Sequence, residues 1–246
     1  MKYTPLSNSV YKRNRINFMN EMKGNCLAVF NSNDIYPVSA DSELPFEQHR
    51  DIFHLSGIDQ EETILLLYPP SKDDKTREIL FIRKSDNHTK VWEGEKLSKK
   101  QANELSGIDN IYYIEDFKAV LSSIATKVDT FYINKNEHYR ANSPVETRED
   151  RFISWLLKKY PAHNVAKSNP ILQRQRSIKH PHEIDQIKRA CEITRKGFNR
   201  VLKFIKPDVW EYEIEAEFIH EFINNSSKGF AYSPIIASGN DNNVLH

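Results

Sequence analysis

The sequence has few of the features that mark cross-linked, secreted or membrane-embedded proteins. It has only two cysteines, Cys26 and Cys191, which lie far apart and lack CxxC spacing, so neither a disulfide framework nor a thiolate metal site is expected. Both thiols are expected to be reduced and buried. No apolar run approaches the roughly 18 residues of a membrane-spanning helix, and no apolar segment follows the basic residues near the start. These absences predict a cytoplasmic protein without a membrane partner.

Glycine and net charge are also scarce. The seven glycines are not clustered, so the chain has neither a Walker loop nor a dinucleotide-binding fingerprint. GxSxG and HExxH motifs are absent, which leaves nucleophilic and simple zinc hydrolysis without a signature. The 35 Lys and Arg nearly cancel the 34 Asp and Glu, and the net charge of +1 gives no general attraction for nucleic acid. The basic run Arg174, Arg176, Lys179, Lys188 and Arg189 is therefore interpreted as a solvated linker.

Two local patterns resemble metal-binding motifs, but the residues around them do not complete a metal site. Glu217 and His220 form a Glu-x-x-His on a helix, but a di-iron bundle needs a second such motif and two further glutamates on facing helices. A solvated acidic helix face explains Glu217 better. His180 and His182 are two residues apart, and side chains at that spacing do not converge on a helix. These patterns give no metal site within this chain.

What the chain does contain is an alternation of short apolar runs and amphipathic stretches. The apolar runs are nearly continuous and rich in β-branched residues, which is typical of an α/β sheet covered by helices on both faces. Strands are expected at 26–30, 52–57, 63–68, 78–82, 111–114 and 130–134, and helices at 98–105, 117–124 and 146–159. Ser98 and Gln101 have the spacing of a capping box at a helix start.

The pattern changes after about residue 170. A long helix is expected to begin at Pro181, with one buried apolar stripe that includes Ile184, Cys191 and Ile205. The next helix is expected to open at Asp208, with Glu211 completing a capping box.

Three separated blocks then resemble a known family. They are FEQHRDIFHLSGIDQEETILLL at 46–67, VWEGEKLS at 91–98, and the region from 174 to 246 that runs from RQRSIKHPHEIDQIKRACEIT through EYEIEAEFIHEF to FAYSPIIASGNDNNVLH. Together and in this order they resemble aminopeptidase P, the Xaa-Pro aminopeptidase branch of the pita-bread metallopeptidases that also include prolidase and creatinase. The resemblance covers nearly the whole chain.

The resemblance implies an α/β fold in two parts. Residues 1–172 would form a creatinase-like amino-terminal domain, a mixed sheet flanked by helices, and residues 173–246 the opening helices and first strand of an incomplete pita-bread α+β domain. The family's metal ligands, two Asp, one His and two Glu, come later than the position that His246 matches. The chain is therefore expected to be an inactive amino-terminal part, and its apolar stripe from Ile184 to Ile205 is expected to cause self-association or disorder after about residue 172.

The chemistry that the resemblance implies belongs to the full-length protein. Two divalent ions, usually manganese, would activate a water that attacks the peptide bond before proline; none is expected in this chain. His246 matches a catalytic histidine that holds the substrate and stabilises the reacting centre. Trp92 matches a tryptophan that reaches a neighbouring subunit's active site, so a homodimer or homotetramer is implied. Asp51 is a candidate substrate contact, although Arg50 replaces the family's usual Ser before it.

Two alternatives remain open at this point. A peptidase-like domain without metal ligands can serve as a binding or oligomerisation module, and the ligand positions beyond His246 would decide this. Within the same fold, a prolidase or a creatinase-type hydrolase would differ in substrate. A proline-containing peptide is the expected substrate of the aminopeptidase, with no nucleic acid partner.

Overall fold

The computed structural model describes residues 3–141 and 143–244 and divides the chain into two compact units. Among these residues, 5–178 form the first unit, and 179–244 together with 3–4 form the second. The chain therefore passes between the units twice, at Thr4–Pro5 and at Ile178–Lys179.

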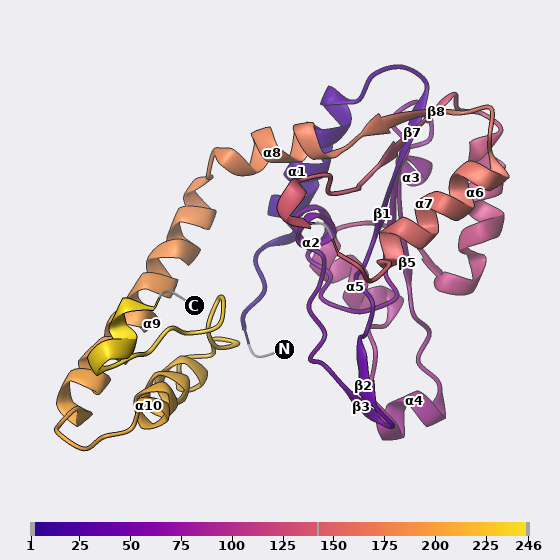
Figure 1. Cartoon of the computed structure of the whole chain (residues 1–246). Coiled ribbons are helices and arrows are strands. Elements are labelled where there is room, and N and C mark those ends of the chain that lie inside the picture. Colours follow the sequence, from indigo (N-terminus) through magenta and orange to yellow (C-terminus); the bar gives the residue numbers. More distant parts are fainter. Residues whose placement is uncertain (1–2, 142, 245–246) are drawn as a thin grey trace. The chain divides into compact units, whose positions relative to one another are not determined.

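A mixed sheet forms the centre of the first unit (Figure 1). Its order is β6 (Asn110–Tyr113), β5 (Glu78–Ile82), β4 (Ile64–Leu67), β1 (Cys26–Asn31), β7 (Thr130–Ile133) and β8 (Asn164–Lys167). β4 runs antiparallel to both of its neighbours, and the other adjacent strands are parallel. A separate hairpin, β2 (Pro37–Ser39) with β3 (Ser42–Glu43), follows β1.

Helices cover both faces of this sheet because its strands are apolar on both sides. On β1, Cys26, Ala28 and Phe30 face one core, and Leu27 and Val29 face the other. The first core includes side chains of α1, α2, α5 and α8, and the second those of α6 and α7. Figure 1 shows the sheet nearly edge-on between these two groups of helices. The predicted α/β sheet with two covered faces is confirmed.

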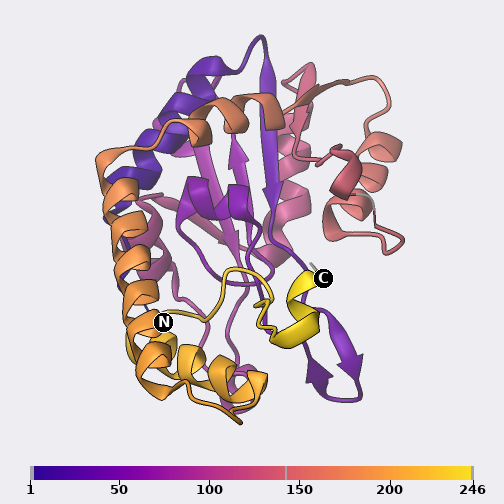
Figure 2. The same cartoon turned by 60° about the vertical axis from the view of Figure 1, so that its left-hand side comes forward.

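Most helices of the first unit begin at a side-chain cap. The helices of this unit are α1 (Asn8–Glu21), α2 (Arg50–Ser56), α3 (Asp74–Arg77), α4 (Asn87–Trp92), α5 (Lys99–Ser106), α6 (Phe117–Ala125), α7 (Arg148–Lys159) and α8 (Asn169–Ser177), with single 3-10 turns η1 (Ile114–Asp116) and η2 (Tyr139–Ala141). The capping box of Ser98 and Gln101 is present at α5, where such a cap stabilises a helix by about 1 kcal/mol. α1 and α8, far apart in sequence, lie side by side (Figure 2).

The segment 52–57 corrects one prediction, because it belongs to a helix and not to a strand. Ile52 and Leu55 are buried on one side of α2, and their spacing of three residues fits a helix, whereas in a strand they would point to opposite faces. Gly57 ends the helix with a left-handed φ of 71°, and its amide donates to the Phe53 carbonyl. A Cβ at Gly57 would overlap the Tyr11 ring, so glycine is needed here for two reasons.

Arg15 connects three elements inside the first core. Its side chain is fully buried, and its Nε donates to Glu78 Oε2 over 2.9 Å at the start of β5. Its Nη1 donates to the carbonyls of Leu55 and Ser106, at 2.8 and 3.0 Å. These carbonyls lie at the ends of α2 and α5, where helices leave acceptors without partners. One guanidinium therefore fixes two helix ends and a strand.

The second unit is a helical hairpin. α9 (Pro181–Phe204) packs against α10 (Glu211–Asn224) where Gly197 allows close approach, since a Cβ there would lie 2.8 Å from the Phe218 ring. Val201, Phe218 and Phe222 form its small core. A 3-10 segment, η3 (Gly239–Asn243), follows.

For the second unit, the predicted burial of the apolar stripe, the predicted start of α10 and the predicted strand are wrong. Ile184 and Ile205 are 40% and 52% exposed and Cys191 is also exposed, because two helices alone cannot cover the whole stripe. α10 begins at Glu211 instead of Asp208, since Asp208 has a φ of 70° that helix does not allow. The described residues from 179 to 244 contain no strand, and they offer no second strand with which one could pair.

Candidate functional site at the carboxyl edge of the sheet

Polar side chains collect where the parallel strands of the first unit end. β1, β5 and β7 share one direction, so Asn31, Arg83 and Asn134 come to the same edge. β4 starts at this edge and is preceded by Glu61 and Glu62. Ligands of open α/β sheets bind at the carboxyl ends of the strands, so this edge is the candidate site.

Asp51 lies here at the start of α2, held by three groups. Arg176 of α8 donates to its Oδ1 over 2.7 Å, and Asn134 donates to its Oδ2 over 3.1 Å. The imidazole of His49 accepts the Asp51 amide at 3.3 Å and so caps the helix. The Asp51 side chain is only 13% exposed. Its carboxylate therefore joins α2, α8 and the end of β7.

Glu149 continues this network to the neighbouring strand. Its carboxyl accepts from Asn31 Nδ2 at 2.8 Å and from the Asn134 amide at 3.3 Å. Burial raises the pKa of Glu149, although these two hydrogen bonds favour the carboxylate. Asn134 thus contacts Glu149 through its backbone and Asp51 through its side chain, which couples the two carboxyl groups.

Trp92 is the last residue of α4, and its side chain is exposed, unlike that of Asp51. Its side chain is 76% exposed, and its ring has His88 as neighbour at 6.2 Å between centroids. The residue after it, Glu93, receives two hydrogen bonds from Arg83, at 2.6 and 2.8 Å. Those bonds hold the pKa of Glu93 below its usual range.

A second carboxylate anchors the same loop. Glu61 accepts from Arg83 at 3.1 Å and lies 2.6 Å from the ammonium of Lys96. The backbone that follows Trp92 is thus tied to the sheet edge, because Glu93 and Lys96 pair with Arg83 and Glu61, while the indole itself stays exposed.

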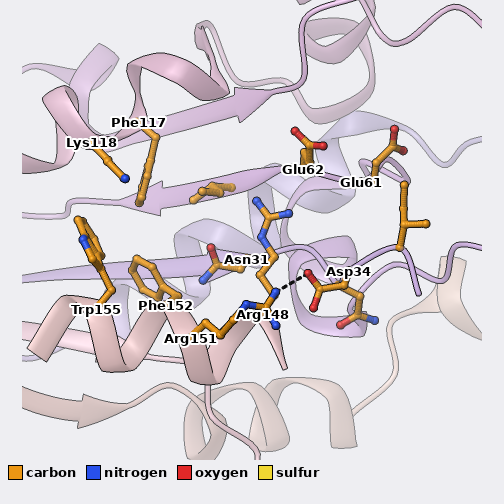
Figure 3. Close-up of a pocket in the computed structure, with 13 residues that line it drawn as sticks. Asn31, Asp34, Glu61, Glu62, Phe117, Lys118, Arg148, Arg151, Phe152 and Trp155 are labelled. Atoms are coloured by element: carbon orange, nitrogen blue, oxygen red, sulfur yellow. Dashed lines mark hydrogen bonds and ion pairs between the residues drawn. The ribbon is translucent and has the colours of Figure 1, made fainter. Parts of the chain in front are cut away.

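A pocket of about 570 Å³ opens at this edge on the side of α6 and α7 (Figure 3). Asn31 forms part of its wall, so the pocket adjoins the Glu149 network. At the rim of the pocket, Arg151 donates a hydrogen bond to Asp34 over 2.7 Å.

The structure describes two of the three residues singled out from the sequence. His246 lies outside the described residues. Trp92 and Asp51 have separate sets of partners, and no contact joins them within the part of the chain that the structure describes. Arg50, which replaces the family's Ser, is 68% exposed by side chain and pairs with Glu47 at 3.2 Å.

Arg176, Arg83, Asn134 and Glu149 were not found from the sequence. Arg176 was included in a basic run interpreted as solvated linker, and this was wrong for it and for Arg174, which pairs with Glu21. A polar residue directly after an apolar strand was the available signal for Arg83 and Asn134.

No group of three or more His, Cys, Asp or Glu among the described residues could hold a metal ion. The acidic residue Glu217, considered for such a role, forms an ion pair with Arg200. In the same described ranges, no helix has the length and apolarity needed to cross a membrane.

Two family models match the chain in succession. Residues 11–132 match the N-terminal domain of aminopeptidase P, and residues 185–246 match metallopeptidase family M24. The chain belongs to the aminopeptidase P family. The family resemblance and the fold class derived from the sequence are thereby confirmed.

Curated relatives of this family agree in sequence. An Escherichia coli Xaa-Pro aminopeptidase is 27% identical over 98% of this chain, which covers 55% of that protein. Human Xaa-Pro aminopeptidase 3 is 26% identical over 87% of this chain, which covers 42% of it. The chain thus spans about half the length of the curated relatives it matches.

Solved structures of aminopeptidase P agree in fold. A Bacillus anthracis protein assigned as an aminopeptidase P superposes with a TM-score of 0.90 at 27% identity, covering 98% of this chain and 57% of that one. The zinc-substituted E. coli aminopeptidase P in complex with product gives 0.76 at 26% identity, covering 90% and 50%.

Proposed function

We propose that the protein to which this chain belongs is an Xaa-Pro aminopeptidase, which removes the first residue from peptides with proline second. The observation that carries the proposal is the succession of an aminopeptidase P N-terminal domain and an M24 segment in one chain. The relatives named Xaa-Pro aminopeptidase support the substrate class. The proposed location is the cytoplasm.

The described residues supply positioning and no metal chemistry. A bound pair of divalent ions, manganese in this proposal, would supply an activated water in the complete protein. The described carboxylates do not form a donor set for these ions, since Asp51, Glu61, Glu93 and Glu149 are each engaged by cationic or amide donors. No hydrolytic step is therefore assigned to them.

Trp92 has the exposure that a substrate contact from a neighbouring subunit requires. An exposed indole on an anchored loop can pack against a proline ring, because both surfaces are apolar. We assign Trp92 to the substrate site of an adjacent subunit in a homodimer or homotetramer, and His246 to the substrate contacts of its own subunit. Asp51 is assigned an indirect role, since Arg176 and Asn134 already occupy both of its oxygens.

The test uses the complete product of the reading frame that encodes this chain, supplied with Mn(II). It should release the first residue of a tripeptide with proline second faster than it cleaves the corresponding dipeptide. A prolidase would show the reverse preference. Absence of metal-dependent release would contradict the proposal and favour a binding module.

A matched pair of variants tests Trp92. Trp92→Ala should lower kcat/KM by about tenfold, the size expected for losing one aromatic contact, with an unchanged melting temperature. Val91→Ala changes an adjacent side chain that is 79% exposed and should leave both quantities unchanged. Equal effects of the two variants would remove Trp92 from the site.

A further inference from the structure

The pocket beside α7 has two chemically different ends. Figure 3 shows aromatic side chains gathered at one end and carboxylates at the other, with Arg148 between them. The lining residues that matter for binding are Phe117, Phe152, Trp155, Arg148, Asp34 and Glu62. Its volume of about 570 Å³ is in the range of small-molecule sites.

Most charges around the pocket are balanced by neighbours. Asp34 accepts from Arg151 at 2.7 Å, and Glu61 lies 2.6 Å from the ammonium of Lys96. Glu62 is 3.8 Å from Arg83 Nε. These acidic groups therefore have cationic partners without the help of Arg148.

Arg148 is the exception among the arginines and carboxylates of the pocket. Its half-buried guanidinium makes no hydrogen bond and no ion pair with any residue in the described ranges. Only longer-range forces act on it, which are attraction to Asp34, Glu62 and Glu149 and repulsion from Arg151. Burial lowers its pKa, but an arginine stays protonated in proteins. A partly desolvated guanidinium with open N–H donors favours a planar anion, which it can bind through two parallel hydrogen bonds.

The other end of the pocket is lined by three aromatic side chains, two of which are largely buried in the core. The rings of Phe117 and Phe152 are 6.0 Å apart between centroids, and those of Phe152 and Trp155 are also 6.0 Å apart. Lys118 also lines the pocket, with its ammonium 5.7 Å from the Trp155 ring. An apolar body placed against these rings would leave water and gain contact area.

We propose that this pocket binds a small monocarboxylate with an aromatic or apolar body. The carboxylate pairs with Arg148, and the body packs against Trp155 and the two phenylalanines. A single negative charge fits because one guanidinium lacks a close partner, and because Asp34 and Glu62 would repel a dianion such as phosphate more strongly than a monoanion. The site lies within residues 31–155 and depends on neither the metal ions nor the proposed peptidase activity.

The first experiment needs no variant. Calorimetric titration of the 246-residue chain with phenylacetate should give saturable binding at one site. Phenylacetamide, the same body without charge, should bind at least about tenfold more weakly, because it loses the charge-assisted hydrogen bonds. Inorganic phosphate should bind more weakly than phenylacetate. Equal binding of acid and amide, tighter binding of phosphate, or no binding of phenylacetate overturns the proposal.

Substitutions then locate the site. Arg148→Gln should weaken phenylacetate by about tenfold or more, and Arg148→Lys by less because the charge remains. Arg140→Gln alters an exposed arginine outside the pocket and should have no effect. Undiminished binding by Arg148→Gln would overturn the assignment of the carboxylate to this guanidinium.

Discussion

Arg176 of α8 donates to Asp51 of α2 over 2.7 Å, although most of the first unit separates the two residues in sequence. Asp51 also accepts a hydrogen bond from Asn134, at the end of β7. The pair therefore connects the final helix of the unit to a helix near its beginning, at the edge where the parallel strands end.

The Asp51–Arg176 pair should contribute modestly to stability. Asp51 is 13% exposed and Arg176 is 44% exposed by side chain, so solvent screens the attraction in part. A double-mutant cycle with Asp51→Asn and Arg176→Gln, measured by urea unfolding, should give a coupling of about 1 kcal/mol. The more exposed pair Glu21 and Arg174 serves as control and should couple by less than about 0.5 kcal/mol. Equal couplings would contradict the role assigned to Asp51.

His49 should make stability depend on pH. Burial lowers its pKa below the ordinary 6.5; Asp51 opposes this, and Arg176 and Arg50 add to it. Below about pH 6.5 the unfolded chain then binds more protons than the folded chain, so this contribution is complete above pH 6.5 and is lost as the pH falls toward the folded pKa. Protonation of Nδ1 would also end its bond from the Asp51 amide.

The measurement is the free energy of unfolding between pH 7.5 and 5.5. His49→Asn keeps a capping side chain but cannot titrate, so its stability should fall less than that of the parent chain over this range. His138→Asn, at an exposed position, should follow the parent curve. Parallel curves for His49→Asn and the parent would refute the prediction.

Removal of Arg15 should be the most damaging of these substitutions. Arg15→Met leaves two buried carbonyls without a donor and Glu78 without its partner, at an expected cost of about 3 kcal/mol or more. Arg77→Met removes a surface arginine that lies 3.5 Å from Asp74 and should cost under about 0.5 kcal/mol. Thermal unfolding of both variants checks the difference; a loss below 1 kcal/mol for Arg15→Met would show that water replaces its hydrogen bonds.

Two glycines allow the energetic cost of backbone strain to be separated from the cost of steric overlap. Gly57 and Gly94 both have left-handed φ values, 71° and 82°, but a Cβ meets the Tyr11 ring at Gly57 and nothing within 4 Å at Gly94. Gly94→Ala should cost about 1 kcal/mol from strain alone, and Gly57→Ala at least about 2 kcal/mol. Similar losses in chemical denaturation would show that Tyr11 moves aside without penalty.

The exposed side of α9 should promote self-association. Ile187 and Leu202 are 49% and 70% exposed on a helix whose remaining cover comes from α10. Sedimentation velocity should show mass increasing with concentration, and Ile187→Gln with Leu202→Gln should reduce it. Leu44→Gln, an exposed leucine of the first unit, should not. A monodisperse monomer with slow amide exchange in α9 would disprove this.

The sequence predicted the central strands of the sheet well because these are buried on both faces, but it did not predict the mostly exposed edge strand β8. Runs such as that from Ile64 to Leu67 are continuous and short, and a helix of that length is uncommon. Capping boxes are local, so the start of α5 at Ser98 followed from four residues. The prediction for segment 52–57 was wrong because a short apolar run does not distinguish a strand from a helix, and Gly57 was the stronger signal for a helix end.

The candidate site was harder to predict because its contacts are long-range. Nothing near Arg176 in sequence indicates Asp51, and nothing near Asn31 indicates Glu149. Arg148 is recognised only by its lack of close partners, which requires knowing where every neighbouring carboxylate points. Composition gives the number of charges but not their pairing.

The order of strands in the sheet also has a consequence for biosynthesis. β1 pairs on one side with β4 and on the other with β7. The β7 side of β1 therefore stays unpaired during translation until the strand that begins at Thr130 has emerged from the ribosome. Until then a strand that is fully buried in the folded protein has an open edge, the kind of surface that pairs with other chains. The portion from β4 to β6 can assemble on β1 earlier. Chaperone dependence during translation should therefore be greatest before residues 130–133 are made.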